Sequence, residues 1–252
     1  MRATPRDTKK VSYSTEIREL KRRLSLTDYQ RSVLIGSILG DGQLEVNWSG
    51  SVYNFNYKLK IAQCLKQKDY VIWKYQIFKD WVLTPPKFDP CNNSYRFRTV
   101  SHKEITNLRN IFYRDGRKVI PRDIGSYINP IVLAVWFMDD GNVARDSRSG
   151  RVSGYIINSQ SFSFEENEIL QSVLSDSFGI KCSIGKNKTY ARLGIWQEDS
   201  RNKFRELVNE FLLPSMQYKL GWKWDFLSPV ETSANLAEMA LVAIKRQLPA
   251  NI

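Results

Sequence analysis

Two short segments of the chain end an apolar run on an acidic residue that is followed by glycine. They are "LIGSILGDG" at 34–42 and "LAVWFMDDG" at 133–141, so Asp41 and Asp140 occupy matching places. Both runs predict helices. A carboxylate at a helix C-terminus is mildly unfavourable, because the unpaired carbonyls there carry partial negative charge. Two such ends lying side by side would repel each other, and they would favour hard divalent cations with carboxylate, carbonyl and water ligands.

The two segments belong to a longer internal repeat. Asp41 and Asp140 are 99 positions apart, and three other matching pairs keep similar offsets, which shrink slowly along the chain: Gln63 and Gln160, Tyr95 and Tyr190, and Pro121 and Pro214. A duplicated unit of about a hundred residues explains these offsets better than chance does. The alternative is a pair of unrelated Asp-Gly helix ends on opposite surfaces, and the repeat favours the paired interpretation.

The composition narrows the chemistry that the chain can perform. One histidine and three cysteines in 252 residues argue against histidine triads, thiolate zinc sites and a disulfide framework. A metal would therefore be held by oxygen, which points to Mg²⁺ or Mn²⁺. His102 is expected only to cap or begin a helix. The odd, widely spaced cysteines fit a reducing compartment, either an organelle or a prokaryotic cytoplasm, and the sequence does not choose between them.

The charge of the chain indicates its partner. Lys and Arg number 38 against 26 acids, for a net charge of +12. Such an excess makes a polyanion the first partner to consider, with nucleic acid ahead of an anionic membrane. The longest apolar run, at 131–138, is far short of the ~20 residues that span a bilayer. The basic first twenty residues have no apolar stretch of the kind that a secretory signal requires.

Periodicity predicts the same order of elements in both halves, which indicates an α+β fold. In the first half the predicted elements are a helix at 25–42 opened by a Ser25–Asp28 capping pair, a strand at 51–63, a helix at 68–82, a strand at 94–100 and a helix at 102–113. In the second half they are a helix at 129–141, a strand at 151–162, a helix at 163–179 opened by a Ser163–Glu166 capping box, strands at 180–186 and 189–197, and a helix at 199–214.

The predicted strands alternate between apolar and polar residues, so each strand has a polar face. Amide and basic side chains at every second position can read a DNA groove, since Arg or Lys pairs with guanine and Asn or Gln with adenine. The alternative is a sheet face that is merely solvated. The candidate DNA-binding residues are Asn54, Asn56, Lys58, Lys60, Arg96, Arg98, Lys186, Lys188, Tyr190 and Arg192.

With these motifs in view, the sequence resembles the LAGLIDADG homing endonucleases of the single-chain type, which carry two copies of the motif. The resemblance continues through "KDWVLTPPK", "RKVIP", "NSQSFSFEE" and "LLPSMQYKL" and covers roughly residues 25–225. It implies two pseudo-symmetric αββαββα-type units, each with a curved antiparallel sheet, packed through the two motif helices. The second copy departs from the family pattern at Val135, where a small residue is usual, so an asymmetric helix contact is expected.

The resemblance also implies the boundaries of these units. A basic N-terminal arm and short helix occupy 1–24, the first unit 25–125, the second unit 126–225, and a C-terminal extension 226–252.

The resemblance further implies a monomeric, site-specific endonuclease that serves intron homing. Such an enzyme hydrolyses both strands of double-stranded DNA across the minor groove, and Asp41 and Asp140 each hold a metal ion for one strand. Gly40 and Asp139 complete the candidate metal ligands. By matching stretches, Lys118 and Lys219 take the places of catalytic lysines, and Gln63 and Gln160 are candidates to order the attacking water. Gln63 is in phase with the apolar face of its strand, so this role requires a bend or bulge near Ala62.

Two other functions stay open at this point. The first is an intron RNA maturase of the same fold, which would bind RNA and assist splicing without cutting DNA. The second is a DNA-binding regulator that keeps the motif for metal-supported folding. The presence of both acidic residues disfavours a degenerate maturase, and a bifunctional protein that both cuts DNA and assists splicing stays open.

Overall fold

A computed structural model describes residues 14–46, 56–185 and 191–222. These residues form two compact units, and each is described by itself. The first contains the described residues of 14–31 and 42–109, and the second contains those of 32–41 and 110–222. Helix α2 (Asp28–Leu39) begins in the first unit and ends in the second. The segment 32–41 therefore belongs to the same unit as the second motif segment.

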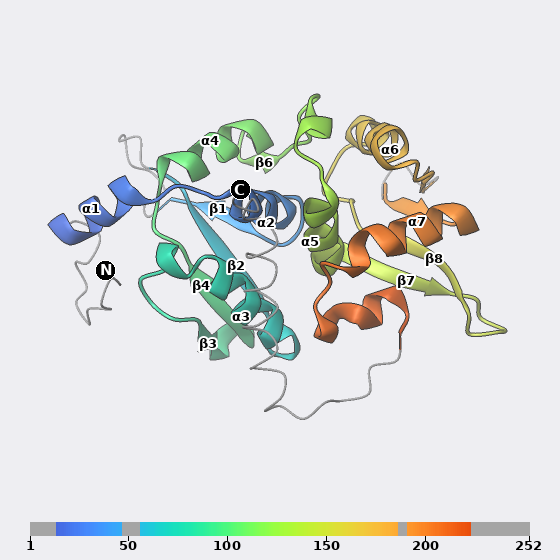
Figure 1. Ribbon diagram of the computed structural model, residues 1–252, viewed down its shortest axis with the longest axis horizontal. Coiled ribbons are helices and arrows are strands. Elements are labelled where there is room, and N and C mark those ends of the chain that lie inside the picture. Colours follow the sequence, from blue (N-terminus) through green and yellow to red (C-terminus); the bar gives the residue numbers. More distant parts are fainter. Residues whose placement is uncertain (1–13, 47–55, 186–190, 223–252) are drawn as a thin grey trace, which may run out of the picture. The chain divides into compact units, whose positions relative to one another are not determined.

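The first unit is built on a four-stranded antiparallel sheet in the order β1-β2-β4-β3. Its strands are β1 (Gln43–Glu45), β2 (Lys58–Cys64), β3 (Lys87–Asp89) and β4 (Ser94–Arg98). Its helices are α1 (Thr15–Arg23), α3 (Lys68–Ile77) and α4 (Lys103–Phe112). The last turn of α4 belongs to the second unit. The 3-10 turns are η2 (Leu65–Gln67), η3 (Lys79–Trp81) and η4 (Pro90–Asn92). Helix α3 packs on β2 and β4 (Figure 1).

Alternation along β2 determines which face of this sheet is buried. Leu59 and Ile61 are almost fully buried, and the Lys58 and Lys60 side chains point to the other face. The strand begins at Lys58, so the prediction of a strand from residue 51 is wrong for Asn56, which precedes β2. Asn56 is exposed and accepts a hydrogen bond from the Thr106 hydroxyl at 3.0 Å.

The second unit has a sheet of the same order, β7-β8-β10-β9. Its strands are β7 (Gly141–Arg145), β8 (Val152–Ile157), β9 (Ser183–Ile184) and β10 (Leu193–Ile195), with a separate hairpin of β5 (Tyr113–Arg114) and β6 (Arg117–Lys118). Its helices are α5 (Pro130–Asp140), α6 (Phe164–Phe178) and α7 (Glu198–Asn209), with the 3-10 segments η5 (Ile124–Ser126) and η6 (Pro214–Leu220).

An aromatic cluster holds the core of the second unit together. Phe137 of α5 packs edge-on against Phe204 of α7 and Tyr155 of β8, with ring centroids 4.9 and 5.9 Å apart. Helices α5 and α7 pack against each other beside the sheet (Figure 1). The bulky residues Trp136 and Phe137 of the second motif are fully buried, and Phe137 lies between the sheet and helix α7.

The identical strand orders confirm the duplicated α+β unit that the offsets predicted. The domain boundaries that the resemblance implies, at residues 24, 125 and 225, stay a prediction. The compact units of the structure have different boundaries, since residues 32–41 and 110–125 belong to the second unit.

Helix starts follow local side-chain chemistry. The capping box of Ser163 with Glu166 is present as predicted. For α2 the predicted Ser25–Asp28 pair is wrong, because the reciprocal bonds join Thr27 and Gln30: each residue's backbone N–H donates to the other's side-chain oxygen at 3.1 Å. The sequence "TDYQ" fits the same rule two residues later, and the structure uses that pair. His102 directly precedes α4 and caps it, one of the two roles expected for it, since Glu104 N donates to its Nδ1.

Candidate active site

Glycines in the first motif allow α2 and α5 to approach closely. A Cβ added at Gly36 would lie 2.7 Å from Val135 Cβ and 2.8 Å from the Val132 carbonyl oxygen, and one added at Gly40 would lie 2.6 Å from Asp139 Oδ2. Gly36 and Val135 hold the third position of their motifs, and Gly40 and Asp139 hold the seventh. The helices therefore meet through matching positions of the repeat. The expected asymmetry at Val135 is accommodated by the missing side chain of Gly36.

This packing brings Asp41 and Asp140 into one charged cluster. Asp41 is exposed, and Asp140 is half-buried at the last position of α5. The pKa of Asp140 is raised to about 7, first by burial and then by the negative charges of Asp41 and Asp139, while Lys118 and Lys219 act against the rise. Two acidic groups from the two halves of the repeat thus converge, as the sequence predicted.

Each motif helix ends against a lysine. Lys118 Nζ, from β6, donates to the Gly40 carbonyl oxygen, and Lys219 Nζ, from η6, donates to the carbonyl oxygens of Met138 at 2.6 Å and Asp139 at 2.9 Å. Lys219 is only 6% exposed. A cation at the C-terminus of a helix is favoured by the partial negative charge of the last carbonyls. The two lysines assigned by the resemblance lie in equivalent places, and their catalytic role stays a prediction.

Asn158 is a polar residue beside Asp140 that the sequence analysis missed. Its backbone N–H and its side-chain amide both donate to the Asp140 carbonyl oxygen, at 3.0 and 2.9 Å. Its Oδ1 accepts from Gln160 Nε2 at 3.4 Å. Gln160 is therefore connected to the acidic cluster through Asn158. An asparagine directly after the apolar stretch "GYII", within the repeat segment of Gln160, was the available signal.

Gln63 occupies the buried face of its strand in the first unit. The pairing of β2 with β4 runs in register from Lys60 opposite Arg98 to Cys64 opposite Ser94, with no bulge at Ala62. Gln63 is 8% exposed and is on the same face as Leu59 and Ile61. The bend that its predicted role required is absent from this strand, so Gln63 is the weakest of the catalytic candidates.

The outer face of the first sheet carries four of the predicted DNA-binding residues. Lys60 pairs with Arg98 and Ala62 with Arg96 in the β2–β4 register, so these side chains share a face. Two carboxylates that the sequence analysis missed are set among them. Glu45 lies 3.0 Å from Arg98, 3.6 Å from Lys58 and 3.8 Å from Lys60, and Asp89 lies 3.0 Å from Arg96. These ion pairs hold the basic side chains of this face in place.

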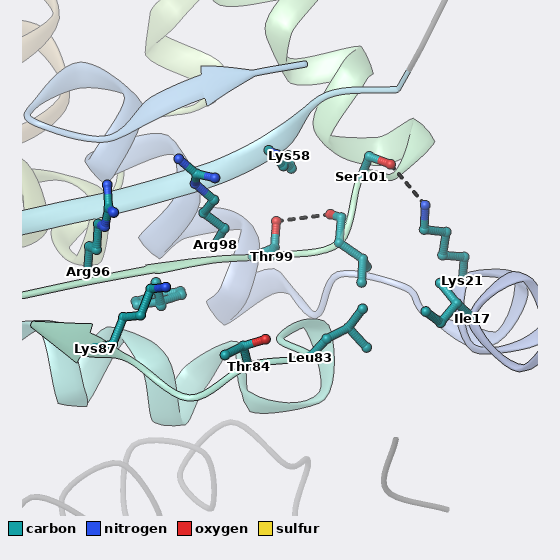
Figure 2. A pocket seen from close by; sticks show the side chains of 12 residues that line it. Ile17, Lys21, Lys58, Leu83, Thr84, Lys87, Arg96, Arg98, Thr99 and Ser101 are labelled. Atoms are coloured by element: carbon teal, nitrogen blue, oxygen red, sulfur yellow. Dashed lines mark hydrogen bonds between the residues drawn. The ribbon is translucent and has the colours of Figure 1, made fainter. Parts of the chain in front are cut away.

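A pocket of about 250 Å³ opens where this face meets α1 (Figure 2). Lys21 of α1 lines it and donates to the Ser101 hydroxyl at 2.9 Å, and Lys87 of β3 lines it beside Arg96. The sequence analysis did not assign Lys21 or Lys87. The remaining lining residues are Ile17, Lys58, Leu83, Thr84, Phe97, Arg98, Thr99, Val100 and Ser101.

The outer face of the second sheet has a different character. Arg192 is exposed next to β10, but Asn54, Lys186, Lys188 and Tyr190 lie outside the described residues. The indole of Trp196 covers Gly154 and Gly194 on this sheet, and its N–H donates to the Ser183 hydroxyl at 2.9 Å. Trp196 is 45% exposed. No role was expected for Trp196 from the sequence.

The acidic cluster has the donor chemistry of a divalent-cation site. Asp41 and Asp140 supply carboxylates, and Gly40 and Asp139 supply carbonyl oxygens at the adjoining helix ends. Within the described ranges, no group of three or more His, Cys, Asp or Glu side chains is arranged to enclose a metal. Two carboxylates with neighbouring carbonyl oxygens could hold Mg²⁺ only together with phosphate and water, which is a common way for this ion to be bound. Burial is the first cause of the raised pKa of Asp140, and the negative charges of Asp41 and Asp139 add to it; a bound cation would offset this repulsion.

Fold and site together define a two-motif nuclease of the LAGLIDADG class. The sequence matches the LAGLIDADG DNA endonuclease family over residues 31–204. A probable intron-encoded endonuclease 1 of Wickerhamomyces canadensis is 30% identical over 208 residues, covering 79% of this chain and 87% of that protein. The chain belongs to the LAGLIDADG DNA endonuclease family.

Two further relatives bear on function. The homing endonuclease I-WcaI, solved bound to its DNA recognition sequence, superposes with a TM-score of 0.73 at 29% identity and covers 84% of this chain and 94% of that one. The cytochrome b mRNA maturase bI2 of Saccharomyces cerevisiae is 26% identical over 208 residues, which is 75% of this chain and 47% of that protein. None of the helices in the described part of the chain could cross a bilayer.

Proposed function

We propose that this chain is a site-specific homing endonuclease that cuts both strands of a long, asymmetric DNA target across the minor groove. Its family membership establishes the class of enzyme. The observation that carries the particular proposal is the convergence of Asp41 and Asp140, one from each copy of the repeat, in a cluster whose mutual repulsion helps to raise the pKa of Asp140 to about 7. Each carboxylate would serve one DNA strand.

Mg²⁺, or Mn²⁺ in its place, is the cofactor that this donor set fits. Asp41 and Asp140 would hold the cations, with Gly40 and Asp139 as neighbouring ligands. A bound divalent cation supplies charge neutralisation at the phosphate and lowers the pKa of the attacking water.

The lysines and glutamines have supporting roles in this proposal. Lys118 and Lys219 place two positive charges beside the carboxylates, where they would also stabilise the charge that develops on the scissile phosphates. Gln160, held by Asn158, would orient the water that attacks one strand. Gln63 is retained as its counterpart for the other strand, although its buried place on β2 argues against it.

DNA would be held by the outer sheet faces. Lys58, Lys60, Arg96 and Arg98 form a basic row on the first sheet, and Lys21 and Lys87 extend it around the pocket in Figure 2. Arg192 contributes from the second sheet. The other predicted contacts are Asn54, Asn56, Lys186, Lys188 and Tyr190. Because a monomer has two non-identical sheets, its target would be asymmetric.

The test is cleavage of the host locus without its intervening sequence. With Mg²⁺ the wild-type chain should make one double-strand cut, and Asp41→Asn and Asp140→Asn should each abolish that cut while DNA binding survives. Asp176→Asn, an exposed carboxylate on α6, is the matched control and should cut normally. Full double-strand cutting by both site variants would remove the assigned chemistry.

A maturase is the second candidate, favoured by the similarity to the yeast cytochrome b mRNA maturase. The same basic surfaces would then bind intron RNA. Splicing of the cognate precursor by an Asp41→Asn variant that no longer cuts DNA would show that the two activities are separate. If neither the wild type nor the variant promotes splicing, endonuclease activity is the one remaining function.

A further inference from the structure

The two motif carboxylates leave their helices in different ways. Asp140 is the last residue of α5, and the next residue, Gly141, donates its N–H to the Phe137 carbonyl oxygen and so continues the helical pattern. Asp41 lies two residues beyond the end of α2 at Leu39. The regular helix therefore carries Asp140 but stops short of Asp41, and the backbone at Asp41 must be fixed by something else.

The carboxylate of Asp139 provides such a contact. The backbone N–H of Asp41 donates to Asp139 Oδ2 at 3.2 Å, across the contact between the two motif helices. Asp139 is only 8% exposed, and its side chain occupies the space that Gly40 leaves open. A charge-assisted hydrogen bond in a half-buried place is stronger than a neutral one at the surface.

The contact has no counterpart in the other half of the repeat. The residue that matches Asp139 in the first motif is Gly40, which has no side chain and cannot return a hydrogen bond to Asp140. The support is therefore one-sided, since the second motif holds the first motif's carboxylate in place. The sequence shows the same difference, since the first motif ends in "LGDG" and the second in "MDDG".

We propose that the Asp139 side chain is a positioning residue, which fixes Asp41 by accepting its backbone N–H and so controls the cleavage of one DNA strand. The proposal rests on the proposed function only for the assignment of one carboxylate to each strand. It separates the Asp139 side chain from the set of metal ligands, to which Asp139 would contribute its carbonyl oxygen. An amide at this position can replace the carboxylate as acceptor, but a methyl group cannot.

The first measurement needs neither DNA nor metal. Backbone hydrogen exchange at Asp41, followed in the full chain in the presence of EDTA, reports whether the N–H is bonded. Asp139→Ala should speed exchange at Asp41 by about tenfold, and Asp139→Asn should leave it within about twofold of wild type, because a hydrogen bond contributes about one power of ten. Unchanged exchange in Asp139→Ala would overturn the proposal, whatever the chain does to DNA.

The second measurement compares the two strands. With each strand of the target end-labelled in turn, Asp139→Ala should change the ratio of the two initial cleavage rates by about tenfold, equivalent to about 1.4 kcal/mol. Asp139→Asn should keep that ratio near its wild-type value. A side chain that only supported the fold would slow both strands equally, and that result would contradict the proposal. A metal-binding carboxylate would make the Asn and Ala variants equally defective, which would contradict it as well.

A substitution at Gly40 should break the same hydrogen bond between Asp41 N and Asp139 Oδ2. In Gly40→Ala the new Cβ would meet Asp139 Cβ at 2.4 Å and Asp139 Oδ2 at 2.6 Å, so it would displace the whole Asp139 side chain while leaving its charge in the site. Gly40→Ala should therefore reproduce both the fast exchange at Asp41 and the altered strand ratio of Asp139→Ala. If no strand is cut by any form of the chain, the proposed function fails, and the exchange measurements still decide the role of Asp139.

Discussion

Lys219 Nζ donates to the Asp139 carbonyl oxygen at 2.9 Å and to the Met138 carbonyl oxygen at 2.6 Å, with only 6% of the residue exposed. A buried ammonium group thus closes the C-terminal end of α5 one residue before Asp140. It both satisfies helix carbonyls and supplies positive charge next to a carboxylate whose pKa is raised. The same side chain therefore contributes to the fold and to the electrostatics of the site.

Lys219→Met should lower stability and cleavage together. The substitution leaves two buried carbonyls without this donor, which should reduce the free energy of unfolding by about 1–3 kcal/mol. It also removes a charge that opposes the rise in the pKa of Asp140. Urea unfolding measures the first effect and plasmid cleavage the second. Lys203→Met is the control, because Lys203 is exposed on α7 and reaches the Gly179 carbonyl only at 3.5 Å. Equal losses in both variants would contradict the role given to Lys219.

Asp140 should make the metal-free protein less stable as the pH rises. Burial, with the charges of Asp41 and Asp139, raises its pKa to about 7, whereas an unfolded chain has an Asp pKa of about 3.9. Between these values the native state keeps a proton that the unfolded state has released, so the free energy of unfolding falls with pH over this window. The fall is complete above about pH 7. Unfolding in EDTA from pH 4 to 8 should show a stability difference between wild type and Asp140→Asn that grows in favour of Asn.

Divalent cations should reverse this trend. A cation at Asp140 has to displace the proton, so Mg²⁺ should raise the melting temperature more at pH 8 than at pH 6. Asp140→Asn should lose most of this pH dependence. A stabilisation by Mg²⁺ that is independent of pH in the wild-type chain would show that Asp140 does not meet the ion.

Gly36 should tolerate a side chain only if Val135 becomes smaller. A Cβ at Gly36 would lie 2.7 Å from Val135 Cβ, so Gly36→Ala should destabilise the protein by about 1–3 kcal/mol through overpacking. Val135→Ala removes Cγ1, which the added Cβ would meet at 2.9 Å, but keeps Val135 Cβ, so it should restore only part of the loss. A double-mutant cycle by urea unfolding measures the coupling. Gly125→Ala is the control, because its Cβ would make only an ordinary contact with Val173 at 3.6 Å. Additive effects would show that the two positions do not touch.

The sequence predicted the features that repeat. Spacing placed Asp41 and Asp140 at helix ends, and the family resemblance placed Lys118 and Lys219 beside them; the structure brings all four into one unit. These predictions were possible because an Asp-Gly helix end that means little by itself occurs at matching places in both copies of the repeat. The Ser163–Glu166 capping box worked because its rule involves residues only three positions apart.

The features that break the repeat could not be predicted in the same way. The hydrogen bond from Asp41 N to Asp139 depends on where α2 ends and on how closely it packs against α5, and both are tertiary properties. Asn158 and Trp196 have roles set by neighbours on adjacent strands, which periodicity does not identify. Helix α2 starts at the Thr27–Gln30 pair, because two overlapping capping patterns compete and the sequence alone does not choose between them.

We expect the Glu45 carboxylate to weaken DNA binding. Its carboxylate lies 3.0 Å from Arg98 and within 4 Å of Lys58 and Lys60, so it neutralises part of the basic row on the first sheet. Glu45→Gln should tighten binding to a duplex of arbitrary sequence and make the dependence of log affinity on log salt steeper by about one, because one more phosphate contact is gained. Arg98→Gln should make it shallower by about one. Fluorescence anisotropy across a KCl series measures both slopes. Equal slopes in the two variants would show that the outer face of this sheet is not where the phosphates lie.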